Sequence, residues 1–307
     1  MNRLRLSLIL MTVLLWGLAL AGCDREAPRV IDLDRRIPES ELVERQHPEG
    51  LHIGIGSIIT PREGYIYYQE LLQWLEKKLR MPVHAVDPGS YARLNSLIGS
   101  GKVQAAFVCG GPYISVHEKF GAELLLAPVV GGSQNYRSYL VVAKDNPATG
   151  YADLRGARFA FTDPDSNSGY LVPAWELKRL GEQPASYFSK TVFTGGHDRS
   201  IRAVAAGLVD AAAVDSLIYD YLSATQPNLV AGTRIAARSK PFGIPPLVAS
   251  STLAPILKQK LVRLLQAAHT DPEGRQILTG MHIERFAPID DSAYDGIRRL
   301  RAELAAP

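Results

Sequence analysis

The sequence is poor in cysteine and in net charge. Only Cys23 and Cys109 are cysteines, too few for a zinc cluster built from cysteine ligands. His117 and Glu118 are not followed by a second histidine at the metalloprotease spacing. Lysine and arginine number 34 against 31 acidic residues, so a net charge of +3 gives no bulk attraction for nucleic acid. We therefore expect no metal, no cofactor and no nucleic-acid partner.

The N-terminus is typical of an export signal. Arg3 and Arg5 precede an apolar stretch over residues 6–20, which is too short and too one-sidedly flanked for a stable membrane span. The signal ends Leu20-Ala21-Gly22-Cys23, which resembles the bacterial lipobox, where a signal peptidase cuts before a diacylated cysteine. We expect Cys23 to carry this lipid; the alternative is an ordinary signal peptide with a chance cysteine.

Removal of a signal peptide over residues 1–22 lowers the formal net charge from +3 to +1, because two arginines are lost. Asp24 resembles the retention signal of enteric lipoproteins and points to the periplasmic face of a Gram-negative inner membrane. Residues 23–50 are polar, rich in charge and proline, and aperiodic, which predicts a flexible tether. With Cys23 lipidated, Cys109 is the only thiol left, so no disulfide can form within the chain.

Strand-like and helix-like segments alternate from residue 51 onward, which predicts parallel sheets with right-handed crossovers. The length exceeds a comfortable single domain, so we expect two lobes. Lobe 1 is predicted over residues 51–138 and 245–307, and lobe 2 over residues 139–244, with a return hinge at 241–246. Strands are expected at 51–56, 83–86, 103–108, 139–143, 158–161, 191–193, 211–214, 235–238 and 247–250, and helices at 67–79, 91–98, 169–180, 200–206 and 217–222.

One polar turn stands between a predicted strand and a predicted helix. It reads Asp163-Pro164-Asp165-Ser166-Asn167-Ser168-Gly169. Helix N-termini bind anions through unpaired N–H groups, the helix dipole and short polar side chains. A single N-cap would account for one of Ser166, Asn167 and Ser168 but not for all three, and Gly169 would permit close approach of a ligand. The turn alone is equally consistent with a cap and with an anion site.

A second turn of the same kind, Thr194 to Ser200, strengthens the anion interpretation. His197 lies in it and can donate a hydrogen bond to an oxyanion, while Asp198 is expected to be the N-cap of the next helix. Asp215 follows the run Ala211 to Val214 and is either a cap or an acceptor for a protonated ligand oxygen or an amine.

Tyr91 and Tyr136 are two further candidates, since their hydroxyls stand near the ends of first-lobe elements. Core packing explains either tyrosine equally well.

The stretch Asp163 to Pro173, the triplet Gly196-His197-Asp198 and the run Val209 to Ser216 together resemble the periplasmic phosphonate-binding family of ABC importers. The family also includes phosphite- and hypophosphite-binding components, and the likeness covers about residues 51–270. It implies a type II periplasmic-binding-protein clam-shell of two α/β lobes, each a mainly parallel sheet flanked by helices.

The resemblance also implies a binding protein that delivers a small oxyanion to an ABC permease. Its ligand contacts would be the tyrosines Tyr91 and Tyr136, the turn Ser166-Asn167-Ser168, His197 and Asp215. Asn167 stands where threonine or serine is common in the family.

Cys109 leaves an alternative open. It closes a predicted strand at the cleft edge of lobe 1, where it either packs or acts as a soft ligand for a thiophilic centre. A related branch of arsenite-binding sensor proteins depends on a cysteine in this region, and such a sensor would signal to a membrane histidine kinase. An enzyme with Cys109 as nucleophile and His197 as base is a third possibility, but no orienting group or oxyanion hole can be assigned.

Overall fold

The computed structural model describes residues 49–56 and 62–306, the side chains of 62–65 excepted. The predicted signal peptide, Cys23 and nearly all of the predicted tether lie outside these residues. The described residues belong to one compact unit. Among their helices, none is both long enough and apolar enough to cross a membrane.

Six strands form the sheet that we call the large sheet. In order across the sheet they are β13 (Arg285–Ala287), β4 (Glu123–Val129), β12 (Leu247–Ala249), β3 (Ala105–Phe107), β1 (Leu51–Ile55) and β2 (Val83–Val86). β1 runs parallel to both β2 and β3, whereas β12 is antiparallel to β3 and β4. Four of the six strands therefore point the same way, and β1 is apolar and largely buried, as a strand covered on both faces must be.

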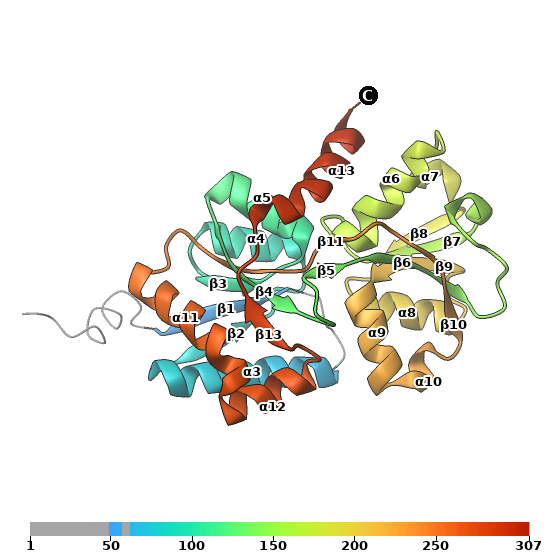
Figure 1. The fold of residues 1–307 in the computed structure, drawn as a ribbon. Coiled ribbons are helices and arrows are strands. Elements are labelled where there is room, and N and C mark those ends of the chain that lie inside the picture. The colour runs from blue at the N-terminus through green and yellow to red at the C-terminus, as the bar shows by residue number, and fades with distance from the viewer. Residues whose placement is uncertain (1–48, 57–61, 307) are drawn as a thin grey trace, which may run out of the picture. The chain divides into compact units, whose positions relative to one another are not determined.

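Helices cover both faces of the large sheet (Figure 1). Leu71 and Leu261 belong to the apolar cluster on one face, and Leu94 and Ile297 to the cluster on the other. The first face carries α3 (Arg62–Leu79), α11 (Pro255–Ala267) and α12 (Pro272–Gly280), and the second carries α4 (Tyr91–Gly99), α5 (Gly110–Phe120) and α13 (Asp295–Ala305). Short 3-10 turns precede α12 at Ala268–Thr270 and α13 at Asp291–Tyr294.

Five strands form the small sheet, in the order β10 (Thr233–Arg238), β6 (Ser138–Ala143), β9 (Ala211–Asp215), β7 (Arg158–Phe161) and β8 (Lys190–Phe193). β7 is parallel to β8 and β9, and only β6 runs the opposite way. Its helices are α6 (Val172–Arg179), α7 (Pro184–Tyr187), α8 (His197–Ala205), α9 (Ser216–Thr225) and α10 (Pro227–Val230), with a 3-10 turn at Tyr151–Leu154 and a π-helical turn at Asn167–Leu171.

The chain crosses between the two sheets twice, and the two crossings pair with each other. β5 (Asn135–Tyr136) and β11 (Phe242–Gly243) form an antiparallel two-stranded ribbon, with Tyr136 opposite Phe242 (Figure 1). The backbone of Gly243 approaches Ala293 so closely that an added Cβ would lie 2.9 Å from its carbonyl oxygen. The segment 241–246, expected as a hinge, thus contains a paired strand.

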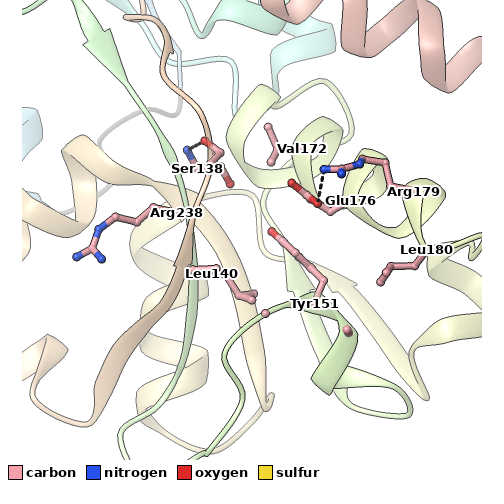
Figure 2. Close-up of a pocket in the computed structure, with 12 residues that line it drawn as sticks. Ser138, Leu140, Tyr151, Val172, Glu176, Arg179, Leu180 and Arg238 are labelled. Atoms are coloured by element: carbon pink, nitrogen blue, oxygen red, sulfur yellow. Dashed lines mark hydrogen bonds and ion pairs between the residues drawn. The ribbon is translucent and has the colours of Figure 1, made fainter.

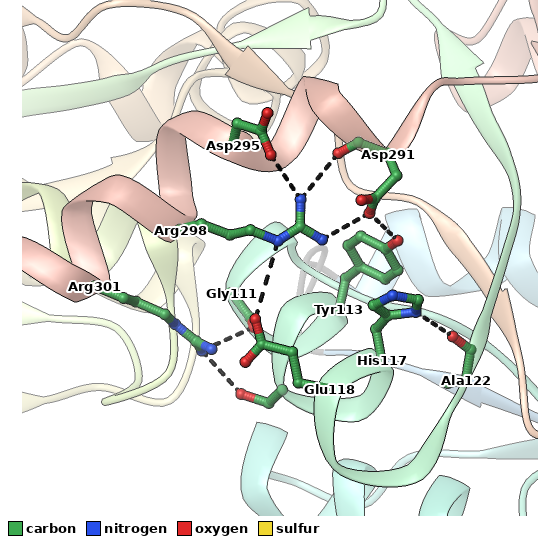
Figure 3. A network of polar contacts seen from close by, with 10 residues as sticks. Gly111, Tyr113, His117, Glu118, Ala122, Asp291, Asp295, Arg298 and Arg301 are labelled. Carbon is green, nitrogen blue, oxygen red and sulfur yellow. Dashed lines mark hydrogen bonds and ion pairs between the residues drawn. The ribbon is translucent and has the colours of Figure 1, made fainter.

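The C-terminal helix α13 contacts helices of both sheets. Arg301 donates to the Gly111 carbonyl oxygen at 2.8 Å on α5, while Glu303 accepts from Trp175 Nε1 at 2.5 Å on α6. Figure 3 shows Arg298 of α13 held between carboxylates, among them Asp291, which also accepts a hydrogen bond from Tyr113 at 2.5 Å. This helix therefore joins α5 and α6 by hydrogen bonds as well as by packing.

The fold differs from the sequence expectations at several places. Helix α5 and strand β4 were not predicted, and the strand expected at 103–108 is confined to Ala105–Phe107. The expectation that Asp198 caps α8 was wrong. Gly196 is the N-cap, in an extended conformation, and Asp198 is the second helical residue. A carboxylate in the first turn is also favoured by the helix dipole, so composition alone did not separate the two positions.

Candidate functional site

The predicted anion turn follows β7 and opens a helix with an unusually wide first turn. Ser166 is the N-cap, and its Oγ accepts the Gly169 N–H at 3.0 Å. Ser166 is therefore the residue of the turn that caps the helix, which leaves Asn167 and Ser168 without a capping role. Asn167 and Ser168 are fully buried, yet Asn167 Oδ1 and Ser168 Oγ have no hydrogen-bond partner among the described residues.

Gly169 serves the turn itself. A Cβ at this position would lie 2.5 Å from the Thr162 side chain, and the Gly169 carbonyl accepts the Thr162 N–H at 3.2 Å. Both backbone groups of Gly169 are thus used within the turn. We predicted that Gly169 permits close approach of a ligand; the structure shows that it also allows the turn to pack against the end of β7.

His197 is the first residue of α8 and is fully buried. Its Nδ1 accepts the Asp215 backbone N–H at 3.1 Å. Since an amide can only donate, Nδ1 carries no proton, and the neutral ring must carry its proton on Nε2. Burial lowers the pKa of His197 to about 3, which keeps the ring neutral. Nε2 is also buried and has no partner in the described part of the chain, so it presents a free N–H donor.

Asp215 ends β9 and caps α9, because its Oδ1 accepts the Leu217 N–H at 2.7 Å. Its other oxygen, Oδ2, is buried and unpartnered within the described residues. Burial raises the pKa of Asp215 to about 8, and the nearby carboxylate of Asp220 acts in the same direction. The carboxyl is therefore mostly protonated at neutral pH, and Oδ2 can donate or accept a hydrogen bond.

Two tyrosines and the thiol complete the site from the large sheet and the crossing strand. Asn167 Nδ2 donates to the Tyr136 hydroxyl at 3.0 Å, and Cys109 Sγ lies 3.7 Å from the same hydroxyl. Burial, and then the neighbouring Cys109, raises the pKa of both Tyr91 and Tyr136, and Asp215 adds to the rise. Tyr91 Oη has no hydrogen-bond partner in the described chain.

Five buried, unpartnered polar atoms thus come from residues that the sequence singled out. We call them the polar cluster: Tyr91 Oη, Asn167 Oδ1, Ser168 Oγ, His197 Nε2 and Asp215 Oδ2. Electrostatic coupling and hydrogen bonds link Asp215 with Tyr91, Cys109, Tyr136 and His197, so the groups share one neighbourhood. Buried polar atoms without partners are rare and each costs about 1–3 kcal/mol. Their concentration indicates a site for a polar ligand.

The large sheet and the small sheet meet at this cluster. The Tyr91 N–H at the start of α4 donates to Asp163 Oδ2 at 3.3 Å, and a Cβ on Gly111 of α5 would lie 2.1 Å from the Asp165 carbonyl oxygen. The turn after β7 therefore contacts the first turns of α4 and α5, two helices of the large sheet.

Sequence reasoning missed three residues around the site. Thr162 lies 3.1 Å from His197 Nδ1 through its Oγ1, and Ser138 Oγ donates to the Ser168 carbonyl at 2.7 Å. Tyr68 of α3 is buried, and after burial the next cause that raises its pKa is the charge of Asp215. Thr162 directly follows β7 but was left out of the polar turn, which was taken to begin at Asp163, whereas Ser138 and Tyr68 lie in no polar turn after a strand. Ser138 begins β6 and could have been found from the pairing of β6 with β9, which places Ser138 opposite Asp215.

The geometry disfavours an enzyme built on Cys109 and His197. Burial raises the pKa of Cys109, with the charge of Asp215 adding to it, whereas a nucleophilic cysteine needs a lowered pKa. His197 Nδ1 is already occupied by the Asp215 amide. Within the described residues, no group of three or more potential ligand side chains is arranged to hold a metal ion.

A family model and curated relatives both match this sequence. The family model described as "ABC transporter, phosphonate, periplasmic substrate-binding protein" matches residues 53–294. The phosphonates-binding periplasmic protein of Escherichia coli K12 is 27% identical over 270 residues, covering 85% of this chain and 80% of its own length. The phosphate-import protein PhnD of Mycolicibacterium smegmatis is 29% identical over 255 residues, covering 76% and 79%.

Solved structures agree on the fold. A binding-protein component of an ABC phosphonate transporter from Pseudomonas aeruginosa superimposes with a TM-score of 0.78 at 23% identity, covering 83% of this chain and 86% of that one. PhnD1 from Prochlorococcus marinus, in complex with methylphosphonate, gives 0.74 at 18% identity, covering 83% and 97%. The predicted type II periplasmic-binding-protein fold is confirmed.

The pKa of Asp215 predicts how the stability of the ligand-free protein depends on pH. Asp215 has a higher pKa folded than unfolded, so its contribution is lost as pH rises toward about 8. His197 has a lower pKa folded, so its effect is confined to the range between about 3 and 6.5. Between pH 6.5 and 8 the free energy of unfolding should fall by about 1 kcal/mol per pH unit on account of Asp215.

Chemical denaturation of wild type and Asp215→Asn across this range measures the effect. Asparagine keeps an oxygen for the Leu217 N–H and cannot ionise. The free energy of unfolding of the variant should therefore lack the fall with pH that is due to Asp215. Equal slopes in the two proteins would show that Asp215 is ionised in the folded state.

Proposed function

Because the chain belongs to the family of periplasmic substrate-binding proteins of phosphonate ABC transporters, we propose that it captures a small phosphorus oxyanion for an ABC importer. The ligand is of the phosphonate, phosphite or phosphate type, and the partner is the importer's permease. The observation that carries the proposal is the polar cluster, whose five atoms have no partner among the described residues. A binding role without turnover follows from the family and agrees with the protonated thiol of Cys109.

The hydrogen-bonding capacity of the cluster supports an oxyanion that carries a proton. His197 Nε2–H can only donate, and the hydroxyls of Tyr91 and Ser168 can donate to ligand oxygens. Asn167 Oδ1 can only accept, which requires a P–OH or another donor on the ligand. Asp215 donates a hydrogen bond to a ligand oxygen when it is protonated and accepts one from a P–OH in either form. Both forms are accessible because its pKa is about 8.

The names of relatives support this ligand class. One relative is named a phosphonates-binding protein, another a phosphate-import protein, and one solved neighbour holds methylphosphonate.

One observation favours a second candidate function, an arsenite-binding sensor that signals to a membrane histidine kinase. Cys109 lies in the site, 3.7 Å from the Tyr136 hydroxyl, and sulfur has an affinity for arsenic. Against it, burial raises the pKa of Cys109 and disfavours the thiolate, which is the form that binds soft centres. The neutral donors around it suit an anion better than uncharged arsenite, so transport remains our first proposal.

We also propose that the protein is held at the periplasmic face of the inner membrane by lipid on Cys23, after removal of residues 1–22. The lipobox-like sequence Leu20-Ala21-Gly22-Cys23 and the following Asp24 support this anchor. The polar segment 23–50 would then act as the tether between lipid and fold. Two lobes, over 51–138 with 245–307 and over 139–244, would close on the ligand.

His197→Ala should weaken oxyanion binding about 10- to 100-fold, because a hydrogen bond to a charged acceptor contributes about 1.5–3 kcal/mol. Isothermal titration calorimetry with phosphite, methylphosphonate and phosphate measures the dissociation constants. His84→Ala is the matched control, since that ring is exposed and hydrogen-bonds the Glu49 carbonyl outside the polar cluster. An unchanged affinity in His197→Ala would contradict the assignment of Nε2 as a ligand donor.

Cys109→Ser separates transport from arsenite sensing. On the transport proposal, wild type binds a phosphorus oxyanion and shows no arsenite binding that depends on the thiol. The same calorimetric panel, with arsenite added, is run on wild type and the variant. Arsenite binding by wild type that disappears in Cys109→Ser would favour the sensor over the transporter component.

Cys23→Ser should lose the lipid and keep residues 1–22, because the lipobox peptidase cuts only before a diacylated cysteine. Mass spectrometry of the wild-type N-terminus should show a diacylglyceryl cysteine at residue 23. Cys109→Ser, which keeps Cys23, should be cleaved and lipidated as wild type is, and so serves as the control. A soluble wild-type protein with an unmodified N-terminus would rule out the anchor.

A further inference from the structure

A cavity distinct from the polar cluster lies between elements of the two sheets. Its volume is about 160 Å³. Phe107, Pro128 and Phe286 line it from β3, β4 and β13, whereas Leu217 and Ile218 line it from α9. The remaining lining residues are Tyr68, Val130, Asp220, Tyr221, Pro245, Met281, His282 and Ile283. Most of these side chains are apolar.

This cavity adjoins the polar cluster. Leu217 lines the cavity, and its backbone N–H donates to Asp215 Oδ1 at 2.7 Å. Tyr68 also lines it, packs edge-on against Phe107 at 5.1 Å between ring centroids, and lies close enough to Asp215 to respond to its charge. Asp215, which supplies Oδ2 to the cluster, therefore also contacts a residue of the cavity wall.

We propose that this cavity is a subsite for an apolar organic group bonded to phosphorus, so that the protein prefers alkyl- and arylphosphonates. The inference rests on the proposed function and specifies its substrate class. In a phosphonate, three oxygens surround phosphorus and the fourth bond goes to carbon. The oxygens occupy the polar cluster, and the carbon substituent enters the cavity past Leu217.

The same geometry disfavours phosphate. The fourth oxygen of phosphate would face Leu217, Phe107 and the other apolar side chains. A buried oxygen without a hydrogen-bond partner is unfavourable by about 1–3 kcal/mol in proteins. An alkyl group at the same place instead gains from the burial of its methylenes.

The size of the cavity sets the largest substituent. An apolar cavity of about 150 Å³ accepts benzene, and this one measures about 160 Å³. A butyl or phenyl group therefore fits.

A cationic substituent is the main competitor, because Asp220 stands at the cavity. Its carboxylate already accepts the Tyr139 hydroxyl at 3.3 Å and is attracted by Arg238. An ammonium group would lose water to apolar walls and share a carboxylate that is already engaged. We expect the cavity to favour the neutral chain.

The larger cavity in Figure 2, about 320 Å³, is a poorer choice for the substituent. All of its lining residues lie between Ser138 and Ser239, so it includes no part of the large sheet and neither Tyr91 nor Cys109. Figure 2 shows Glu176 and Arg179 paired beside Tyr151 in this space, so charged side chains line part of it.

Calorimetric titration of the ligand-free protein with methyl-, n-propyl-, n-butyl-, phenyl- and 2-aminoethylphosphonate, and with phosphite and phosphate, tests the inference. Affinity should rise up to about fourfold per added methylene, hence up to about sixtyfold from methyl to butyl. Phenylphosphonate should bind at least as tightly as propylphosphonate. Propylphosphonate should exceed 2-aminoethylphosphonate, which has the same size and shape but carries an ammonium group.

Leu217→Ser should lower the ratio of butyl to methyl affinity by about fivefold, since Leu217 lines the cavity and its N–H bonds Asp215. Leu208→Ser is the matched control, because Leu208 is 68% exposed and lies outside the cavity, and its ratio should equal that of wild type. Thermal melts of both variants verify folding. If Leu217→Ser does not fold, Ile283→Ser, at a half-buried wall position, replaces it.

Two results overturn the inference while the proposed function stands: methylphosphonate or phosphite binding with no gain from longer chains, or tighter binding of 2-aminoethyl- than of propylphosphonate. Absence of binding by every phosphorus compound overturns the proposed function and the inference together. A butyl-to-methyl ratio that Leu217→Ser leaves unchanged places the substituent outside this cavity and also overturns it.

Discussion

The hydrogen bond from the Asp215 amide to His197 Nδ1 determines the chemistry of the whole site. It joins the end of β9 to the first residue of α8 at 3.1 Å and leaves the histidine proton on Nε2. The same residue, through Oδ1, caps α9, so one aspartate sets the start of one helix and the tautomer of the residue that starts another. If this bond were lost, the ring could turn or change tautomer, and the site would lose its fixed donor.

The anion recognition that we propose uses groups that are neutral in the folded protein. Burial keeps His197 unprotonated and Asp215 protonated at neutral pH, so the polar cluster offers dipoles and protons in place of a formal positive charge. Such donors act strongly because surrounding apolar side chains exclude water and lower the local dielectric. The two sheets supply different atoms of the cluster, and the β5–β11 ribbon and α13 hold the elements that carry them.

The sequence allowed the two-sheet α/β organisation to be predicted, together with the residues that supply the polar cluster. Strand β7 was located correctly, and Ser168, His197 and Asp215 were recognised because polar residues after buried strands carry a local signal. Asp198 was misassigned because the extended conformation of Gly196, which makes Gly196 the cap, cannot be derived from residue types. The packing of Gly169 against Thr162 was not predicted for the same reason. The apolar cavity could not be predicted, since its walls come from strands and helices that only tertiary folding brings together.

The hydrogen bond between Trp175 and Glu303 gives the protein a built-in optical probe. Of the tryptophans in the described chain, Trp74 is buried in the core beside the large sheet, whereas Trp175 lies on α6 with its indole N–H bonded to α13 and Arg179 over its ring at 4.8 Å. Any displacement of α6 from α13 must break that bond and change the polarity around the indole. Movement between the two sheets is therefore visible in the intrinsic fluorescence of the unlabelled protein, with Trp74 as an internal reference.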